Sequence, residues 1–190
     1  MSMNKQNLWI AFWPMWILAN AIGWLLVTVL FIFPFWSLGV IMGIAFVLSV
    51  LQWLVLENYL GIDFMWVWLS TPTYGLFLFA IFFIRSDNSF LTDLLASIVC
   101  LAFLGLLQRS VLNYYVNNAT VWVVVNPIAS MAGLIISSAL GNLLNYESPA
   151  LLWSTLGIIY GCITGAALIL LKRSEFRPAQ LASSDNIEDR

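Results

Sequence analysis

Six apolar stretches, each close to the length that crosses a lipid bilayer, occupy most of this 190-residue chain. A helix needs about 20 residues to cross about 30 Å of hydrocarbon. Hydrophobic residues make up 62% of the sequence and charged residues only 8%, too few to cover the surface of a soluble domain. We therefore predict one all-α integral membrane domain over residues 1–173. Its six transmembrane helices are expected at residues 8–33, 36–56, 64–84, 90–112, 121–140 and 149–171.

A spaced repeat indicates that these helices form three tandem helical hairpins. Gln52 and Gln108 lie 56 residues apart, and so do Trp66 and Trp122. Very few residues separate the first two spans, so they are expected to be antiparallel neighbours. The polar segment 174–190 cannot bury enough apolar surface to fold, and we expect it to be a flexible cytoplasmic tail.

The basic residues predict the orientation of the chain in the membrane. With six spans, one side receives six of the seven Lys and Arg residues, and the other side receives only Arg85. Because basic residues accumulate on the cytoplasmic side, both termini are expected there. The net charge of −2 and the lack of a basic stripe argue against a nucleic-acid partner and leave the lipid bilayer as the main one.

Amides inside apolar helices are the main candidates for a functional site. An amide in hydrocarbon is unfavourable unless it is hydrogen-bonded, so these side chains should point into the bundle. They either link helices to one another or line a pocket that has tryptophan walls and opens toward the cytoplasm. Trp24 is a further candidate for contact with an apolar ligand. The proposed ligand-binding or interhelical polar cluster is Trp16, Asn20, Gln52, Trp68, Gln108 and Asn126.

Glycines at four-residue spacing predict close packing between helices, because small residues let two backbones approach in lipid. A salt bridge is also predicted between Glu57 and Arg109, at the cytoplasmic ends of the second and fourth spans. The predicted helix-packing positions are Gly39, Gly43, Gly157, Gly161 and Gly165.

Three motifs carry a resemblance to a known group of proteins. They are Trp16-x-x-Ala-Asn-Ala-x-Gly23-Trp24, Gly39-x-x-x-Gly43 and Gln52-Trp-Leu-Val-Leu56. The chain resembles bacterial multi-spanning membrane proteins built from repeated W-x-L-A-x-x-x-G-W and G-x-x-Q-W-L-V-L hairpins. The last two spans match poorly, with Leu170 as the nearest counterpart of the glutamines. That group has no established biochemical function, so the resemblance implies only the architecture and a bacterial cytoplasmic (inner) membrane or other internal membrane.

Function is constrained mainly by what the sequence lacks. It has no histidine and two widely separated cysteines, so neither a metal site nor a cofactor is expected. We favour a non-enzymatic protein that binds a membrane-protein partner, forms a homo-oligomer or serves as an assembly or accessory subunit. The alternative is binding or transport of a small apolar ligand, as in the similarly sized substrate-binding subunits of energy-coupling-factor vitamin transporters. A lipid-modifying enzyme is a third class, for which Asp93, Glu147 and Glu57 qualify by depth alone.

Overall fold

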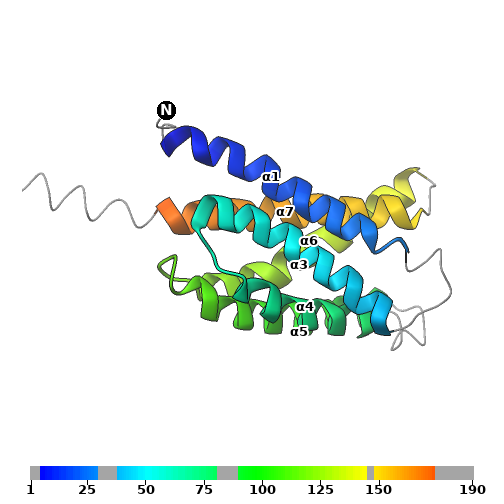
Figure 1. Cartoon of the computed structure of the whole chain (residues 1–190). Coiled ribbons are helices and arrows are strands. Elements are labelled where there is room, and N and C mark those ends of the chain that lie inside the picture. Colours follow the sequence, from blue (N-terminus) through cyan, green and yellow to red (C-terminus); the bar gives the residue numbers. More distant parts are fainter. Residues whose placement is uncertain (1–4, 30–37, 81–89, 145–147, 174–190) are drawn as a thin grey trace, which may run out of the picture.

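The computed structural model describes residues 5–29, 38–80, 90–144 and 148–173, and these residues form six helices (Figure 1). The predicted all-α class is confirmed, and the helices pack as sequential hairpins. The predicted tail at 174–190 and Arg85 lie outside the described residues. The helices are α1 (Lys5–Leu26), α3 (Leu38–Leu60), α4 (Met65–Phe79), α5 (Phe90–Leu112), α6 (Val121–Leu144) and α7 (Pro149–Arg173).

Local backbone chemistry sets the tight connection between α3 and α4. Gly61 adopts φ +69°, in the left-handed region that favours glycine, and its N–H donates to the Glu57 carbonyl at 2.9 Å. This contact ends α3 one turn beyond the predicted limit. Asp63 Oδ1 then accepts a hydrogen bond from the Met65 N–H at 2.9 Å, at the first residue of α4.

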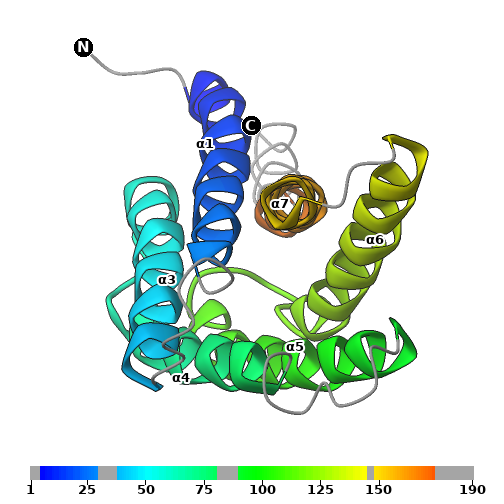
Figure 2. The same cartoon turned by 90° about the vertical axis from the view of Figure 1, so that its right-hand side faces the viewer.

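The helices form a closed ring. Each helix contacts the next one along the chain, and α7 contacts α1. Figure 2 shows this closure, with α7 seen almost end-on between α1 and α6. The three hairpins α1–α3, α4–α5 and α6–α7 therefore meet in a cycle, in which α3 packs on α4, α5 on α6, and α7 on α1.

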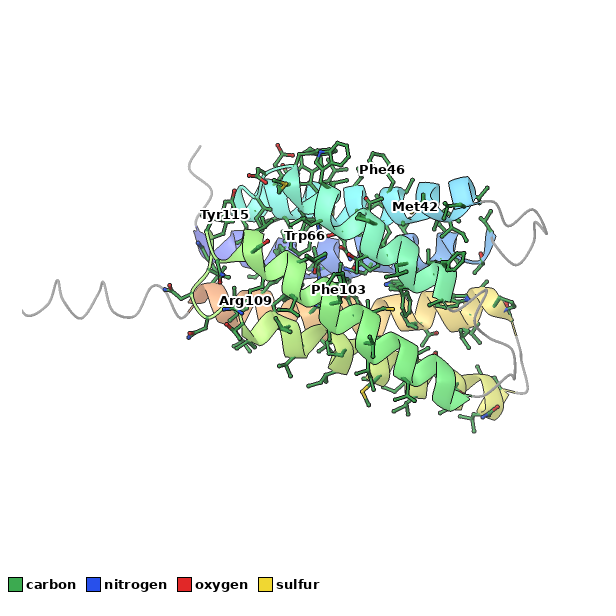
Figure 3. The ribbon with its side chains drawn as sticks, turned by 90° about the horizontal axis from the view of Figure 1, so that it is seen from below. Met42, Phe46, Trp66, Phe103, Arg109 and Tyr115 are labelled. Carbon is green, nitrogen blue, oxygen red and sulfur yellow. The ribbon has the colours of Figure 1, made fainter. Side chains whose placement is uncertain are left out.

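The ring exposes large apolar side chains on its outside and buries a set of polar side chains within an otherwise apolar core. Large hydrophobic side chains such as Leu18, Phe46 and Leu170 are exposed, and Phe46 lies at the outer margin in Figure 3. Unpaired backbone and side-chain polar groups are unfavourable in hydrocarbon. Helices that turn their polar side chains inward, where these can form hydrogen bonds, are therefore compatible with a lipid environment. The buried polar side chains are Asn20, Ser49, Gln52, Ser70, Thr73, Gln108, Asn126, Ser130, Ser137 and Thr164.

Helix length and composition indicate a multi-pass membrane protein. Among the described residues, three helices are long and apolar enough to cross a membrane: α3, α6 and the Pro149–Lys172 part of α7. The apolar segments Ile10–Leu26 of α1 and Ile98–Leu112 of α5 are shorter, and α4 has 15 residues. Contact with the lipid bilayer follows from the exposed apolar surface, whereas six complete crossings stay a prediction.

Candidate functional site

The first helix of each hairpin presents three inward positions at four-residue intervals. Residues spaced by four lie on one face of a helix, and all nine side chains at these positions are at most 1% exposed. They form three successive levels along the helix axes, and each level contains one residue from each of α1, α4 and α6. The positions are Trp16, Asn20 and Trp24; Trp66, Ser70 and Tyr74; and Trp122, Asn126 and Ser130.

Trp68 does not belong to this inward face. Its side chain is 71% exposed, whereas Trp66 is fully buried and lies among the packed side chains in Figure 3. Two residues correspond to about 200° around a helix, so both cannot face the same way. The prediction that placed Trp68 in the polar cluster is therefore wrong, and the 56-residue spacing between Trp66 and Trp122 was the correct signal.

The second helix of each hairpin has a buried polar side chain at one shared repeat position. Gln52 in α3, Gln108 in α5 and Thr164 in α7 are each at most 1% exposed, and successive members are 56 residues apart. Leu170, named above as the counterpart of the glutamines, is 67% exposed. The counterpart is Thr164, which sequence reasoning missed although the equal spacing could have found it.

One chain of hydrogen bonds crosses the ring from α1 to α6. Gln52 Nε2 donates to Asn20 Oδ1 at 2.8 Å and to the Tyr74 hydroxyl at 2.9 Å. The Tyr74 and Tyr160 hydroxyl oxygens are 3.5 Å apart, and the Tyr160 hydroxyl donates to Asn126 Oδ1. Because α4 and α7 are not neighbours in the ring, the two tyrosines meet across its interior.

Two further sets of bonds complete the polar layer. Gln108 Nε2 donates to Ser70 Oγ at 2.7 Å, and its Oε1 accepts from Trp122 Nε1 at 2.7 Å. Trp16 Nε1 donates to Thr164 Oγ1 at 2.9 Å. Asn20 and Asn126 are therefore joined by side chains from five helices. Gln108 of α5 is linked to this chain through Trp122, whose carbonyl accepts from Asn126 Nδ2 at 2.9 Å. We call this set the polar layer: Trp16, Asn20, Gln52, Ser70, Tyr74, Gln108, Trp122, Asn126, Tyr160 and Thr164.

Apolar side chains close the polar layer on both sides. Leu56, Leu112 and Leu168 are fully buried and again 56 residues apart, one turn beyond the two glutamines and Thr164. On the other side, Trp24 stacks on Trp153 with ring centroids 5.8 Å apart. Buried apolar side chains therefore flank the polar layer at both ends.

Three polar atoms at the inward positions have no hydrogen-bond partner among the described residues. They are Trp24 Nε1, Trp66 Nε1 and Ser130 Oγ, and their side chains are fully buried. An unpaired buried donor typically costs about 1–3 kcal/mol. Within the described part of the chain, no group of three metal-ligating side chains occurs.

The glycines of α7 pack directly on α1. A Cβ added at Gly161 would lie 2.9 Å from Ile17 Cα, and one at Gly157 would lie 2.7 Å from the Asn20 carbonyl oxygen. A Cβ at Gly165 would lie 2.8 Å from both Trp13 and Trp16. These three glycines therefore close the ring, as helix-packing positions inside one chain.

The glycines of α3 behave differently. Gly39 is exposed, and a Cβ added at Gly43 would meet nothing within 4 Å. The prediction that Gly39 and Gly43 pack against a neighbouring helix of the chain is therefore wrong. They lie on the outer face of α3, which the four-residue spacing alone cannot distinguish from an inner face.

The predicted salt bridge between Glu57 and Arg109 is absent from the part of the chain that the structure describes. Glu57 is exposed, and Arg109 Nε is buried without a hydrogen-bond partner there. The 56-residue repeat shows why the prediction failed, because it makes Arg109 equivalent to Trp53 and not to Glu57. The two charged residues therefore do not occupy matching positions of their helices. Of the other two acidic candidates, the Asp93 side chain and Glu147 lie outside what the structure describes.

No family model, curated protein or solved structure matches this chain. The resemblance to bacterial hairpin-repeat membrane proteins therefore stays a prediction, and the case for function depends on the polar layer.

Proposed function

We propose that this is a non-enzymatic multi-pass membrane protein that binds a small uncharged molecule inside its helical ring. The observation that carries the proposal is the set of three buried polar atoms without partners, on either side of a connected hydrogen-bond network. The side chains of the polar layer are amides, hydroxyls and indoles, which bind by hydrogen bonding and stacking and favour a neutral ligand. Small-molecule sites commonly combine an apolar lining with a few polar groups.

The role of the α7 glycines reduces the case for a partner-binding or assembly subunit. In sequence, Gly157, Gly161 and Gly165 were the strongest candidates for an interaction surface. All three lie against α1 of the same chain. A partner would therefore need another surface, such as the outer face of α3 with Gly39 and Gly43. The unpaired buried polar atoms lead us to favour the small-molecule proposal.

Native mass spectrometry of the protein, extracted gently from its own membrane, tests the proposal. We expect a small molecule bound at about one per chain, and its loss in Asn20→Leu and Asn126→Leu, since each removes a buried amide of the polar layer. Asn58→Leu is the matched control, because Asn58 is an exposed amide. A stoichiometric second polypeptide with no small molecule would instead favour an assembly subunit.

We also propose that both termini face the cytoplasm of a bacterial cytoplasmic or other internal membrane. The start of α1 and the end of α7 lie at one end of the bundle (Figure 1), the end where Arg109 and Tyr115 lie (Figure 3). Lys172 Nζ donates to the Tyr115 carbonyl at 2.9 Å, which links α7 to the loop before α6. Basic residues at this end support a cytoplasmic location.

Cysteine labelling in intact and permeabilised cells checks this orientation. In a Cys100→Ser, Cys162→Ser background, Tyr114→Cys should react with an impermeant maleimide only after permeabilisation of the inner membrane. Leu143→Cys, at the opposite end, should react in spheroplasts without it. Both side chains are highly exposed, at 87% and 77%, so access through the protein does not limit either reaction. The reverse pattern would overturn the orientation.

A further inference from the structure

Among the three buried polar atoms without a hydrogen-bond partner, Trp66 Nε1 differs from its equivalents in the other two hairpins. Trp16, Trp66 and Trp122 occupy the same position in the first helix of each hairpin. Trp122 donates to Gln108 of the preceding hairpin, and Trp16 donates to Thr164, which precedes it around the closed ring. The equivalent acceptor for Trp66 would be Gln52, but Trp66 Nε1 has no partner among the described residues.

Tyr74 explains why Gln52 does not accept a hydrogen bond from Trp66. The Tyr74 hydroxyl lies 2.9 Å from Gln52 Nε2 and 3.2 Å from Gln52 Oε1. Its counterparts in the other hairpins are Trp24 and Ser130, and neither Trp24 Nε1 nor Ser130 Oγ bonds to the equivalent residue, Thr164 or Gln108, in the described part of the chain. Gln52 is therefore engaged by Asn20 and Tyr74, and the indole N–H of Trp66 is left without the acceptor that its two equivalents have.

We propose that Trp66 Nε1 is a ligand contact, and that the ligand is a small neutral molecule with a carbonyl oxygen on an apolar body. An indole N–H only donates, so the group that meets it must be an acceptor. The polar layer contains no lysine or arginine that would offset an anion, which makes the acceptor neutral. The surrounding buried side chains include Leu56, Ile62 and Trp122, which favours an apolar body. This inference rests on the proposed function and narrows it to one contact.

The Trp66 ring packs against a second indole from across the ring of helices. Its centroid is 6.2 Å from that of Trp122, with the two planes tilted by 57°. Trp66 comes from α4 and Trp122 from α6, which are not neighbours in the ring. The carbonyl site therefore lies toward the ring interior and not on the lipid-facing surface.

Indole ¹H–¹⁵N spectra of the full chain in nanodiscs, labelled with ¹⁵N-tryptophan, test the inference with cyclohexanone as the probe. Trp66→Phe assigns the relevant peak. We expect cyclohexanone to shift that peak downfield in a saturable manner, while the Trp122 and Trp16 peaks, whose protons are already bonded, move little. Cyclohexane, which lacks the oxygen, should leave the Trp66 peak in place. A Trp66 peak that responds equally to both compounds, or to neither, would contradict the inference and point to a bound water.

A matched pair of substitutions separates this inference from the broader proposal. Trp66→Phe and Trp122→Phe remove the same buried volume, but Trp66→Phe removes a donor that has no partner. Its melting temperature should therefore fall less than that of Trp122→Phe, while occupancy by the native small molecule falls about tenfold. Trp122→Phe breaks the bond to Gln108 and should lower the melting temperature. If the native molecule remains fully bound in Trp66→Phe, the Trp66 contact is wrong although the proposed function stands. If the unmodified protein carries no small molecule, the proposed function itself fails.

Discussion

Gly161→Leu is expected to prevent the ring from closing and to destabilise the protein by about 3 kcal/mol or more. The first side-chain carbon alone would lie 2.9 Å from the Cα atom of Ile17. That atom belongs to the backbone of α1, which cannot move aside as a flexible side chain could. The loss should appear as a fall of about 6–12 °C in the melting temperature in detergent, or as a failure to accumulate in the membrane.

Gly43→Leu is the matched control for this prediction. The same substitution on α3 adds its side chain where a Cβ meets nothing within 4 Å, so the melting temperature should change little. If both variants are equally stable, α7 does not pack on α1 through Gly161. If both are equally unstable, the leucine acts through membrane insertion and not through ring closure.

The same reasoning applies at the other junctions between hairpins. Gly105 of α5 is 56 residues before Gly161, and a Cβ added there would lie 2.8 Å from Val123 Cα of α6. Ser49 of α3 lies a further 56 residues back and is fully buried. A small residue therefore recurs wherever the second helix of one hairpin packs on the first helix of the next, and the closure between α7 and α1 follows the same pattern.

The positions of the helices and of the inward amides could be predicted from the sequence. Long apolar stretches must satisfy their backbone hydrogen bonds as helices in lipid. Asn20, Gln52, Gln108 and Asn126 were expected to point inward because an unpaired amide in hydrocarbon is unfavourable, and all four are buried. In each case one large energetic cost, that of an unpaired polar group in hydrocarbon, decided the prediction.

The orientation of apolar and small residues could not be predicted in the same way. Lipid chains and neighbouring helices are similarly apolar, so burial of Trp66 and exposure of Trp68 have no strong signature in hydrophobicity. The glycine pairs illustrate the same limit, since Gly39 and Gly43 have the spacing of Gly157 and Gly161 but face outward. The 56-residue repeat, applied to every position, would have corrected Trp68 and identified Thr164, because equivalent residues of the hairpins share an orientation.

Gln108→Leu is expected to lower the free energy of unfolding by about 1–3 kcal/mol. The substitution removes the acceptor of Trp122 Nε1 and the donor to Ser70 Oγ, both at 2.7 Å. Hydrogen bonds between membrane helices contribute on average about 0.6 kcal/mol and at most about 1.7 kcal/mol, and two are lost together. The measurement is reversible unfolding in mixed micelles, with Leu112→Met as a control, since this change at a buried position nearby conserves volume and breaks no such bond.

A double-mutant cycle with Trp122→Phe separates the lost hydrogen bond from simple repacking. Once Trp122 Nε1 has been removed, the bond to Gln108 no longer exists, so the double variant should be less destabilised than the sum of the two single variants. Strict additivity would mean that the 2.7 Å contact contributes no coupling energy. The same cycle between Gln108→Leu and Trp66→Phe should be close to additive, because no hydrogen bond joins Trp66 to Gln108 among the described residues. This contrast would show whether specific hydrogen bonds of the polar layer hold the hairpins together. Only a layer held by such bonds leaves one indole donor, Trp66 Nε1, available to a ligand.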